Sequence, residues 1–204
     1  MNRRPIRGLI TLALASAALV QAGAQDPRIG SRLDAPSRAA ITALVDSARA
    51  QGLPVEPLME KVYEGQGKGA DGPRIVAAVR SLMLEMASAH RALGTVASVD
   101  EIKAAASAMH AGVPAVELGK MKKQSGLKRS LTLPFTVLAD LVSRGVPVEG
   151  GVNAIKSLVG AGAKDAEINN FQRNVSVDIE QGAPPAAAVE TRAKVVPPKP
   201  DEDQ

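Results

Sequence analysis

One three-residue pattern, glycine followed by any residue and then proline, recurs along the chain and most constrains its fold. Glycine readily adopts the left-handed conformation with which many helices end. Proline is tolerated at the first position of a helix, where an N–H is not needed. Each triplet therefore predicts the end of one helix and the start of the next. The four triplets are Gly52-Leu53-Pro54, Gly112-Val113-Pro114, Gly145-Val146-Pro147 and Gly182-Ala183-Pro184.

The spacing of these triplets is compatible with a helix-pair repeat. The last two intervals are 33 and 37 residues, close to the period of roughly 33–47 residues found in helix-pair arrays. However, Pro134 lies inside one of these units, and no side-chain consensus extends beyond the triplets. The sequence therefore leaves two arrangements open, a helix-pair array and an irregular helical bundle.

Between the breaks, apolar residues recur at spacings of three and four, which is typical of amphipathic helices. The first stripe contains Ile41, Leu44, Val45 and Ala48, and Ser37 is the expected N-cap. No segment reads as a convincing strand. The sequence predicts an all-α fold of eight or nine short helices, in an irregular bundle or a helix-pair array, without a sheet. The first predicted helix spans 38–50, and the second begins at Pro54 and breaks at Gly65. The later predicted ranges are 73–93, 99–111, 114–124, 131–144, 147–160, 165–181 and 184–193. The pattern Ser98-x-x-Glu101 predicts a capping box at the start of the helix over 99–111.

The first 24 residues have the three parts of a secretory signal peptide. Three arginines precede a mostly apolar run over 9–20, and Ala22-Gly23-Ala24 supplies the small residues that signal peptidase requires. We therefore expect export to the periplasm or the medium, with cleavage after Ala24. The chain then divides into a signal peptide (1–24), a linker (25–36), a single helical domain (37–192) and a tail (193–204). The prolines and charges of the tail predict disorder.

The composition narrows the classes of function. The first 24 residues carry three arginines and no acid, so their removal would lower the net charge from +4 to +1. That value gives no general case for binding nucleic acid. The chain contains no cysteine, which excludes disulfides and a cysteine-linked lipid anchor. Only Tyr63, Phe135 and Phe171 are aromatic, so the chain lacks the ring platforms on which sugars or bases stack.

The glycine-rich segment 65–72 is the first candidate for chemistry. It precedes a helix start, where backbone N–H groups can bind an anion. Lys61, Lys68 and Arg74 would add positive charge and are candidate contacts for an anion or a partner. The segment is not a P-loop, because Gly69 rather than Ser or Thr follows Lys68. The alternative is a plain connector between two helices.

A local basic cluster is the second candidate. The sequence KMKKQSGLKR places five cations within ten residues, of which Lys122 and Lys123 are candidate contacts for an acidic partner or for anionic lipid headgroups. The alternative is the solvated end of a helix, where cations interact favourably with the helix dipole. The five cations are Lys120, Lys122, Lys123, Lys128 and Arg129.

The segment 52–82 also resembles a known group of sequences. Its distinctive residues are Gly52-Leu53-Pro54, Pro57-Leu58, Lys61, Glu64-Gly65, Lys68-Gly69, Arg74-Ile75 and Ala78-Val79. This pattern resembles one found in uncharacterised exported bacterial proteins that are helical. The resemblance covers about 31 of the 204 residues and implies no activity. It indicates that the region from Lys61 to Arg74 is the distinctive part of the chain.

No catalytic, cofactor-binding or metal-binding residue can be assigned from the sequence. His90 and His110 lie on separate predicted helices, and the sequence has no His-x-x-x-His pair and no cysteine, whereas a metal site needs three or four converging ligands. A Gly-x-Ser-x-Gly nucleophile elbow is also missing. The sequence favours a non-enzymatic exported protein that binds a partner protein or an envelope component, without a cofactor. An envelope hydrolase with unidentified catalytic residues and a peripheral binder of anionic lipid remain alternatives.

Overall fold

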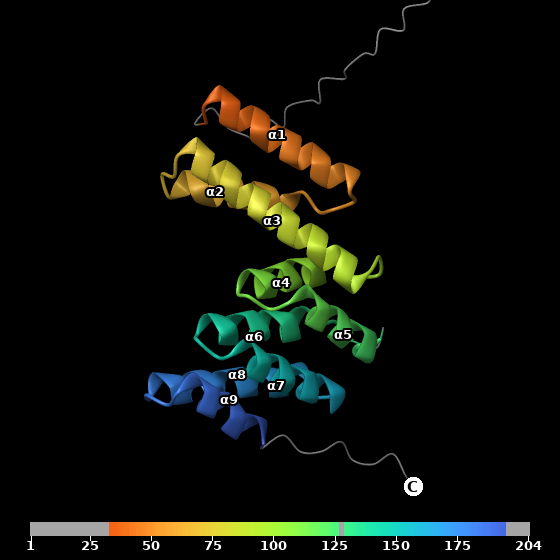
Figure 1. The fold of residues 1–204 in the computed structure, drawn as a ribbon, viewed down its shortest axis with the longest axis vertical. Helices are drawn as coiled ribbons and strands as arrows, with labels where there is room; N and C mark the ends of the chain where they lie inside the picture. Colours follow the sequence, from red (N-terminus) through yellow and green to blue (C-terminus); the bar gives the residue numbers. More distant parts are fainter. Residues whose placement is uncertain (1–32, 127–128, 195–204) are drawn as a thin grey trace, which may run out of the picture.

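The computed structural model describes residues 33–126 and 129–194, and every regular element in these ranges is an α-helix (Figure 1). The predicted all-α fold is thus confirmed for the described residues. The predicted signal peptide (1–24), most of the linker and the tail from residue 195 onward lie outside them. The helices are α1 (Ala35–Ala50), α2 (Glu56–Gly67), α3 (Gly72–Leu93), α4 (Val99–His110), α5 (Ala115–Ser125), α6 (Thr132–Ser143), α7 (Val148–Gly160), α8 (Asp165–Glu180) and α9 (Pro185–Ala193).

Helix α1 begins three residues earlier than predicted, inside the expected linker. Its N-cap is Asp34, whose Oδ1 accepts a hydrogen bond from the Ser37 N–H at 2.8 Å. The expectation that Ser37 caps this helix is therefore wrong. The Ser37 hydroxyl instead donates to the second carboxylate oxygen of Asp34 at 2.9 Å. Aspartate and serine are both good caps, and here the aspartate lies one turn upstream.

The prediction that the glycine of each Gly-x-Pro triplet ends a helix is confirmed. The prediction that its proline is the first residue of the next helix is wrong. All four glycines have positive φ, from 68° at Gly52 to 107° at Gly112. Pro54 lies two residues before α2, and the other three prolines are N-cap residues rather than the first residues of their helices. They take this place because an N-cap residue has an extended backbone, which the fixed φ of proline permits.

The residue between the glycine and the proline explains why these breaks are sharp. Its N–H returns to a carbonyl five residues back, as from Val146 to Leu141 at 3.0 Å and from Val113 to Ala108 at 2.9 Å. Its side chain is buried at Leu53, Val113 and Val146. This is the Schellman motif with its apolar contact. The same bond closes the turns at Gly69 and Gly162, where no proline follows.

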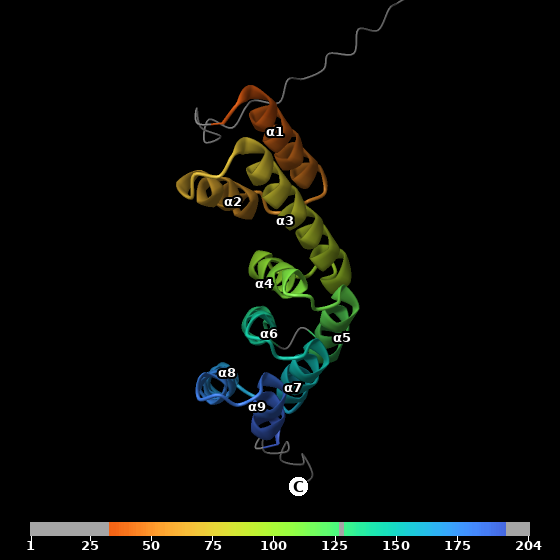
Figure 2. The same cartoon turned by 60° about the vertical axis from the view of Figure 1, so that its left-hand side comes forward.

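The helices are arranged as a two-layer array. One layer contains α2, α4, α6 and α8, within which α4 packs on α6 and α6 on α8. The other contains α1, α3, α5, α7 and α9, each of which packs on the next. Figure 2 shows that the array curves, with the first layer on the concave side and the second on the convex side. Of the two arrangements left open by the sequence, the helix-pair array is the one observed.

The core lies between the two layers and consists mostly of alanine, leucine, valine and isoleucine. Phe135 on α6 is its one fully buried aromatic side chain among the described residues. Small residues also let neighbouring helices within a layer approach closely. A Cβ at Gly119 of α5 would lie 2.9 Å from the Ala92 carbonyl oxygen of α3. Within the described residues, no helix is both long and apolar enough to cross a bilayer.

Candidate functional site

The glycine-rich segment is shorter as a loop than the sequence predicts. Helix α2 continues to Gly67, so the predicted break at Gly65 is wrong and only residues 68–71 connect it to α3. Gly65 is needed for packing rather than for a turn. A Cβ at this position would lie 2.6 Å from Cγ1 of Ile75, so glycine allows α2 to pack against α3.

The N-terminus of α3 is already faced by two carboxylates. Oδ1 of Asp71 accepts the Arg74 N–H at 2.8 Å, and a Cβ at Gly72 would lie 2.4 Å from Oδ2 of Asp34. Hydrogen bonds from the backbone N–H and the hydroxyl of Ser37 lower the pKa of Asp34, so its negative charge is stabilised there. A bound anion at this helix end would meet two like charges. The geometry therefore gives no support to the expected anion site.

The three cations of this region differ in their ion pairs. Lys61 and Lys68 both donate to Glu64, at 2.7 Å and 2.6 Å. These hydrogen bonds and charges lower the pKa of Glu64 to about 2. Arg74 is exposed, and its side chain has no ion-pair partner among the described residues. The three predicted contacts thus lie around the α2–α3 turn at one end of the array, and two of them share one carboxylate.

The structure places Lys122 in the interior rather than on the surface. Its side chain is 10% exposed, and Nζ lies 2.8 Å from both carboxylate oxygens of Glu101. This corrects the expectation of a surface contact, because the ammonium cannot reach a partner. Lys123, its neighbour, is exposed on the outer layer. Lys128 of the same predicted cluster lies outside the described residues.

Glu101 holds together three segments of the array. Oε2 also accepts the Ser98 N–H at 3.0 Å, which completes the predicted capping box at the start of α4. Oε1 also accepts the Leu131 N–H at 2.9 Å, at the start of α6. Desolvation raises the pKa of Glu101, but hydrogen bonds from Lys122, Leu131 and Ser98 outweigh it and the net pKa is lowered. The carboxylate is therefore ionised and structural.

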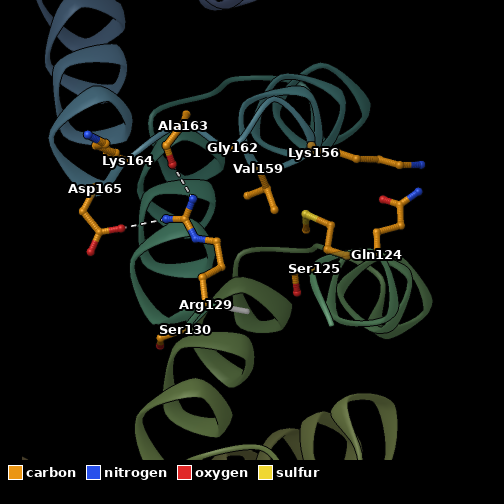
Figure 3. A pocket seen from close by; sticks show the side chains of 12 residues that line it. Gln124, Ser125, Arg129, Ser130, Lys156, Val159, Gly162, Ala163, Lys164 and Asp165 are labelled. Atoms are coloured by element: carbon orange, nitrogen blue, oxygen red, sulfur yellow. Dashed lines mark hydrogen bonds and ion pairs between the residues drawn. The ribbon is translucent and has the colours of Figure 1, made fainter. Parts of the chain in front are cut away.

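A cleft of about 610 Å³ lies where α5, α7 and the start of α8 meet (Figure 3). Its floor is apolar and includes Met121 of α5 and Val159 of α7. Its polar lining comes from four segments, because the α5–α6 and α7–α8 connections lie on the same edge of the array. The polar side chains are those of Gln124, Ser125, Arg129, Ser130, Lys156, Lys164 and Asp165.

Arg129 ties the two connections together inside this cleft. Its guanidinium donates to the Ala163 carbonyl and to Oδ1 of Asp165, the latter at 2.7 Å. Its side chain is only 21% exposed. Sequence reasoning placed Arg129 in a basic cluster but did not find Lys156, Lys164 or Asp165. No local pattern links them, since helix packing alone brings them together.

The side chains that line the cleft are mostly polar, and those that carry a charge are predominantly cationic. Among the described residues, three cationic side chains and one acidic side chain line it, a net of two positive charges. Neither His90 nor His110 lines it, and Nδ1 of His110 lies 3.0 Å from Oε1 of Glu85 elsewhere on the array. Among the described residues, no cluster of three or more His, Cys, Asp or Glu could hold a metal ion.

Comparison with known proteins adds no family to this description. No protein-family model, no curated protein and no solved structure matches the chain. The resemblance of residues 52–82 to exported bacterial proteins therefore stays a prediction.

Proposed function

We propose that this chain is a non-enzymatic scaffold that binds a partner protein. The observation that carries the proposal is the open, curved two-layer array of helices (Figure 2). Stacked helix pairs contact only their neighbours and leave an extended concave surface, which proteins of this architecture use for binding. If residues 1–24 direct export, the partner is a component of the envelope or of the medium.

The inner layer offers side chains for such contacts. Helix α6 is covered by α4, α7 and α8, which leaves the concave side as its open side. Thr136 and Ser143 are exposed on it. Helix α8 adds Asn169 and Arg173, both exposed. Neutral polar and charged side chains are mixed on this surface, which suits a protein partner better than a strongly anionic one.

Site-specific photo-crosslinking in cells tests the proposal. A photoreactive residue is placed at Thr136 in the inner layer or, as a matched control, at Val116, which is 60% exposed on α5 of the outer layer. We expect one protein to be captured from Thr136 and not from Val116, identified by mass spectrometry. Capture of the same proteins from both positions, or of none from either, would contradict a concave binding face.

A further inference from the structure

We propose that the cleft between α5 and α7 binds an acidic peptide segment of the partner. This inference rests on the proposed scaffold function and adds a site and a ligand chemistry to it. The cleft lies where α5 and α7 of the outer layer meet the connections that lead to α6 and α8 of the inner layer. A partner held on the inner layer can therefore extend a segment of its chain into the cleft.

The charges of the cleft favour a negatively charged ligand. Asp165, the acidic lining residue among those the structure describes, is paired with Arg129. Within the described residues, neither Lys156 nor Lys164 has an ion-pair partner. Lysine side chains that the protein does not neutralise attract acidic partners and raise their rate of association. The two unpaired ammonium groups are thus the charge that a ligand can use.

The arrangement of these cations selects an extended ligand over a single small anion. In Figure 3, Lys156 lies beside Gln124 on one side of the cleft, whereas Arg129 and Lys164 lie on the other. They do not converge on one point. The start of α8 offers no anion site either, because Glu167 already accepts the Lys164 N–H at 2.6 Å. Several carboxylates spread along a chain match this spacing of charges.

The floor of the cleft adds an apolar requirement. The apolar lining residues Met121, Val159 and Ala163 are all largely buried. Methionine adapts its shape to different apolar groups, which is why it recurs in peptide-binding surfaces. The cleft therefore fits a segment in which an apolar side chain is flanked by glutamate or aspartate.

Fluorescence anisotropy with the full chain tests this inference. The probe is a fluorescein-labelled peptide, Glu-Glu-Leu-Glu-Glu. We expect saturable binding that weakens with added salt, because the contacts are exposed ion pairs. The double variant Lys156→Glu with Lys164→Glu should weaken binding about tenfold or more. The matched control is Arg80→Glu with Arg91→Glu, which makes the same change in net charge at exposed residues outside the cleft, and it should bind like the parent.

Three outcomes would overturn the inference. The first is that the parent does not bind the peptide at low salt. The second is equal weakening by both double variants, which would show non-specific attraction. The third is that only a variant in which Asp201, Glu202 and Asp203 are replaced by their amides binds the peptide. In that case these acidic residues of the chain itself, and not a segment of a partner, would occupy the cleft in the parent. Circular dichroism of each variant checks that the fold is intact.

Crosslinking from Thr136 in the Lys156→Glu, Lys164→Glu background separates the two proposals. Loss of the captured protein supports the cleft as part of the binding surface. Capture that persists in this background leaves the scaffold function in place and overturns the cleft inference. If the parent chain captures nothing from Thr136, the scaffold function itself fails, whatever the peptide does.

Discussion

At the scale of the residue, two glycines have the same free space around them but differ in backbone conformation. Gly52 has a φ of 68°, whereas Gly67 ends α2 without a positive φ, and nothing lies within 4 Å of a Cβ built at either position. Gly52→Ala should lower the free energy of unfolding by about 1 kcal/mol, because an L-residue resists the left-handed conformation. Gly67→Ala should not lower it, because alanine favours the helix over glycine. Urea denaturation of both variants measures the difference, and equal stabilities would contradict the assigned helix end.

The local sequence predicts where helices break but not which of their charged residues are buried. Helix breaks follow from local chemistry, so the glycines at positive φ and the Ser98–Glu101 capping box could be predicted. The burial of Lys122 could not, because its partner Glu101 lies 21 residues away and no periodicity links them. Lys122 and Lys123 are neighbours in one basic run, yet helix rotation places one in the core and the other in solvent. Packing between helices decides which of them is available.

At the scale of the element, the Glu101–Lys122 pair joins α4, α5 and the start of α6. Lys122→Met should destabilise the protein by about 3 kcal/mol, because it leaves a buried carboxylate without its cation. Lys123→Met, on the same helix but exposed, should change the stability by less than about 0.5 kcal/mol. Chemical denaturation at pH 7 measures both. Similar stabilities of the two variants would show that the buried pair contributes little.

The same pair predicts a pH dependence. The pKa of Glu101 is lowered in the folded state from its ordinary value of 4.5. Its stabilising contribution is therefore complete above that value and is lost as the pH falls through the lowered pKa. The stability difference between the parent and Lys122→Met should be largest at neutral pH and should shrink in acid, since the other carboxylates titrate alike in both. A constant difference across this range would mean that Glu101 does not titrate with folding.

The candidate site also belongs to the element scale, because it could not be predicted without knowing how the helices stack. Each helix range was predicted to within a few residues, but the sequence could not say which connections share an edge. Arg129 precedes α6 and Asp165 begins α8, and they meet only because the array stacks the α5–α6 and α7–α8 connections together. The spacing of the Gly-x-Pro triplets indicated repetition without fixing how the pairs stack. The cleft is a property of that stacking.

At the scale of the whole molecule, each helix of the array is stabilised mainly by contacts with its neighbours. The extensive contacts among the described helices join elements no more than two apart along the chain. In such a chain each unit depends on its neighbours, and the ends can open without the middle. The proposed binding surface of the middle helices can therefore stay folded while a terminal pair opens.

A substitution in α9 tests this consequence. Val189 is 3% exposed and packs near Gly150 of α7, so Val189→Asp buries an unpaired carboxylate. Ala187→Asp, exposed on the same helix, is the matched control and should leave the protection of all helices unchanged. In Val189→Asp, hydrogen exchange measured by mass spectrometry should lose its protection in α8 and α9 and keep it in α1, α2 and α3. Loss of protection in all helices at once would mean that the chain unfolds as a single cooperative bundle, because the damage would then have spread beyond the neighbours of α9.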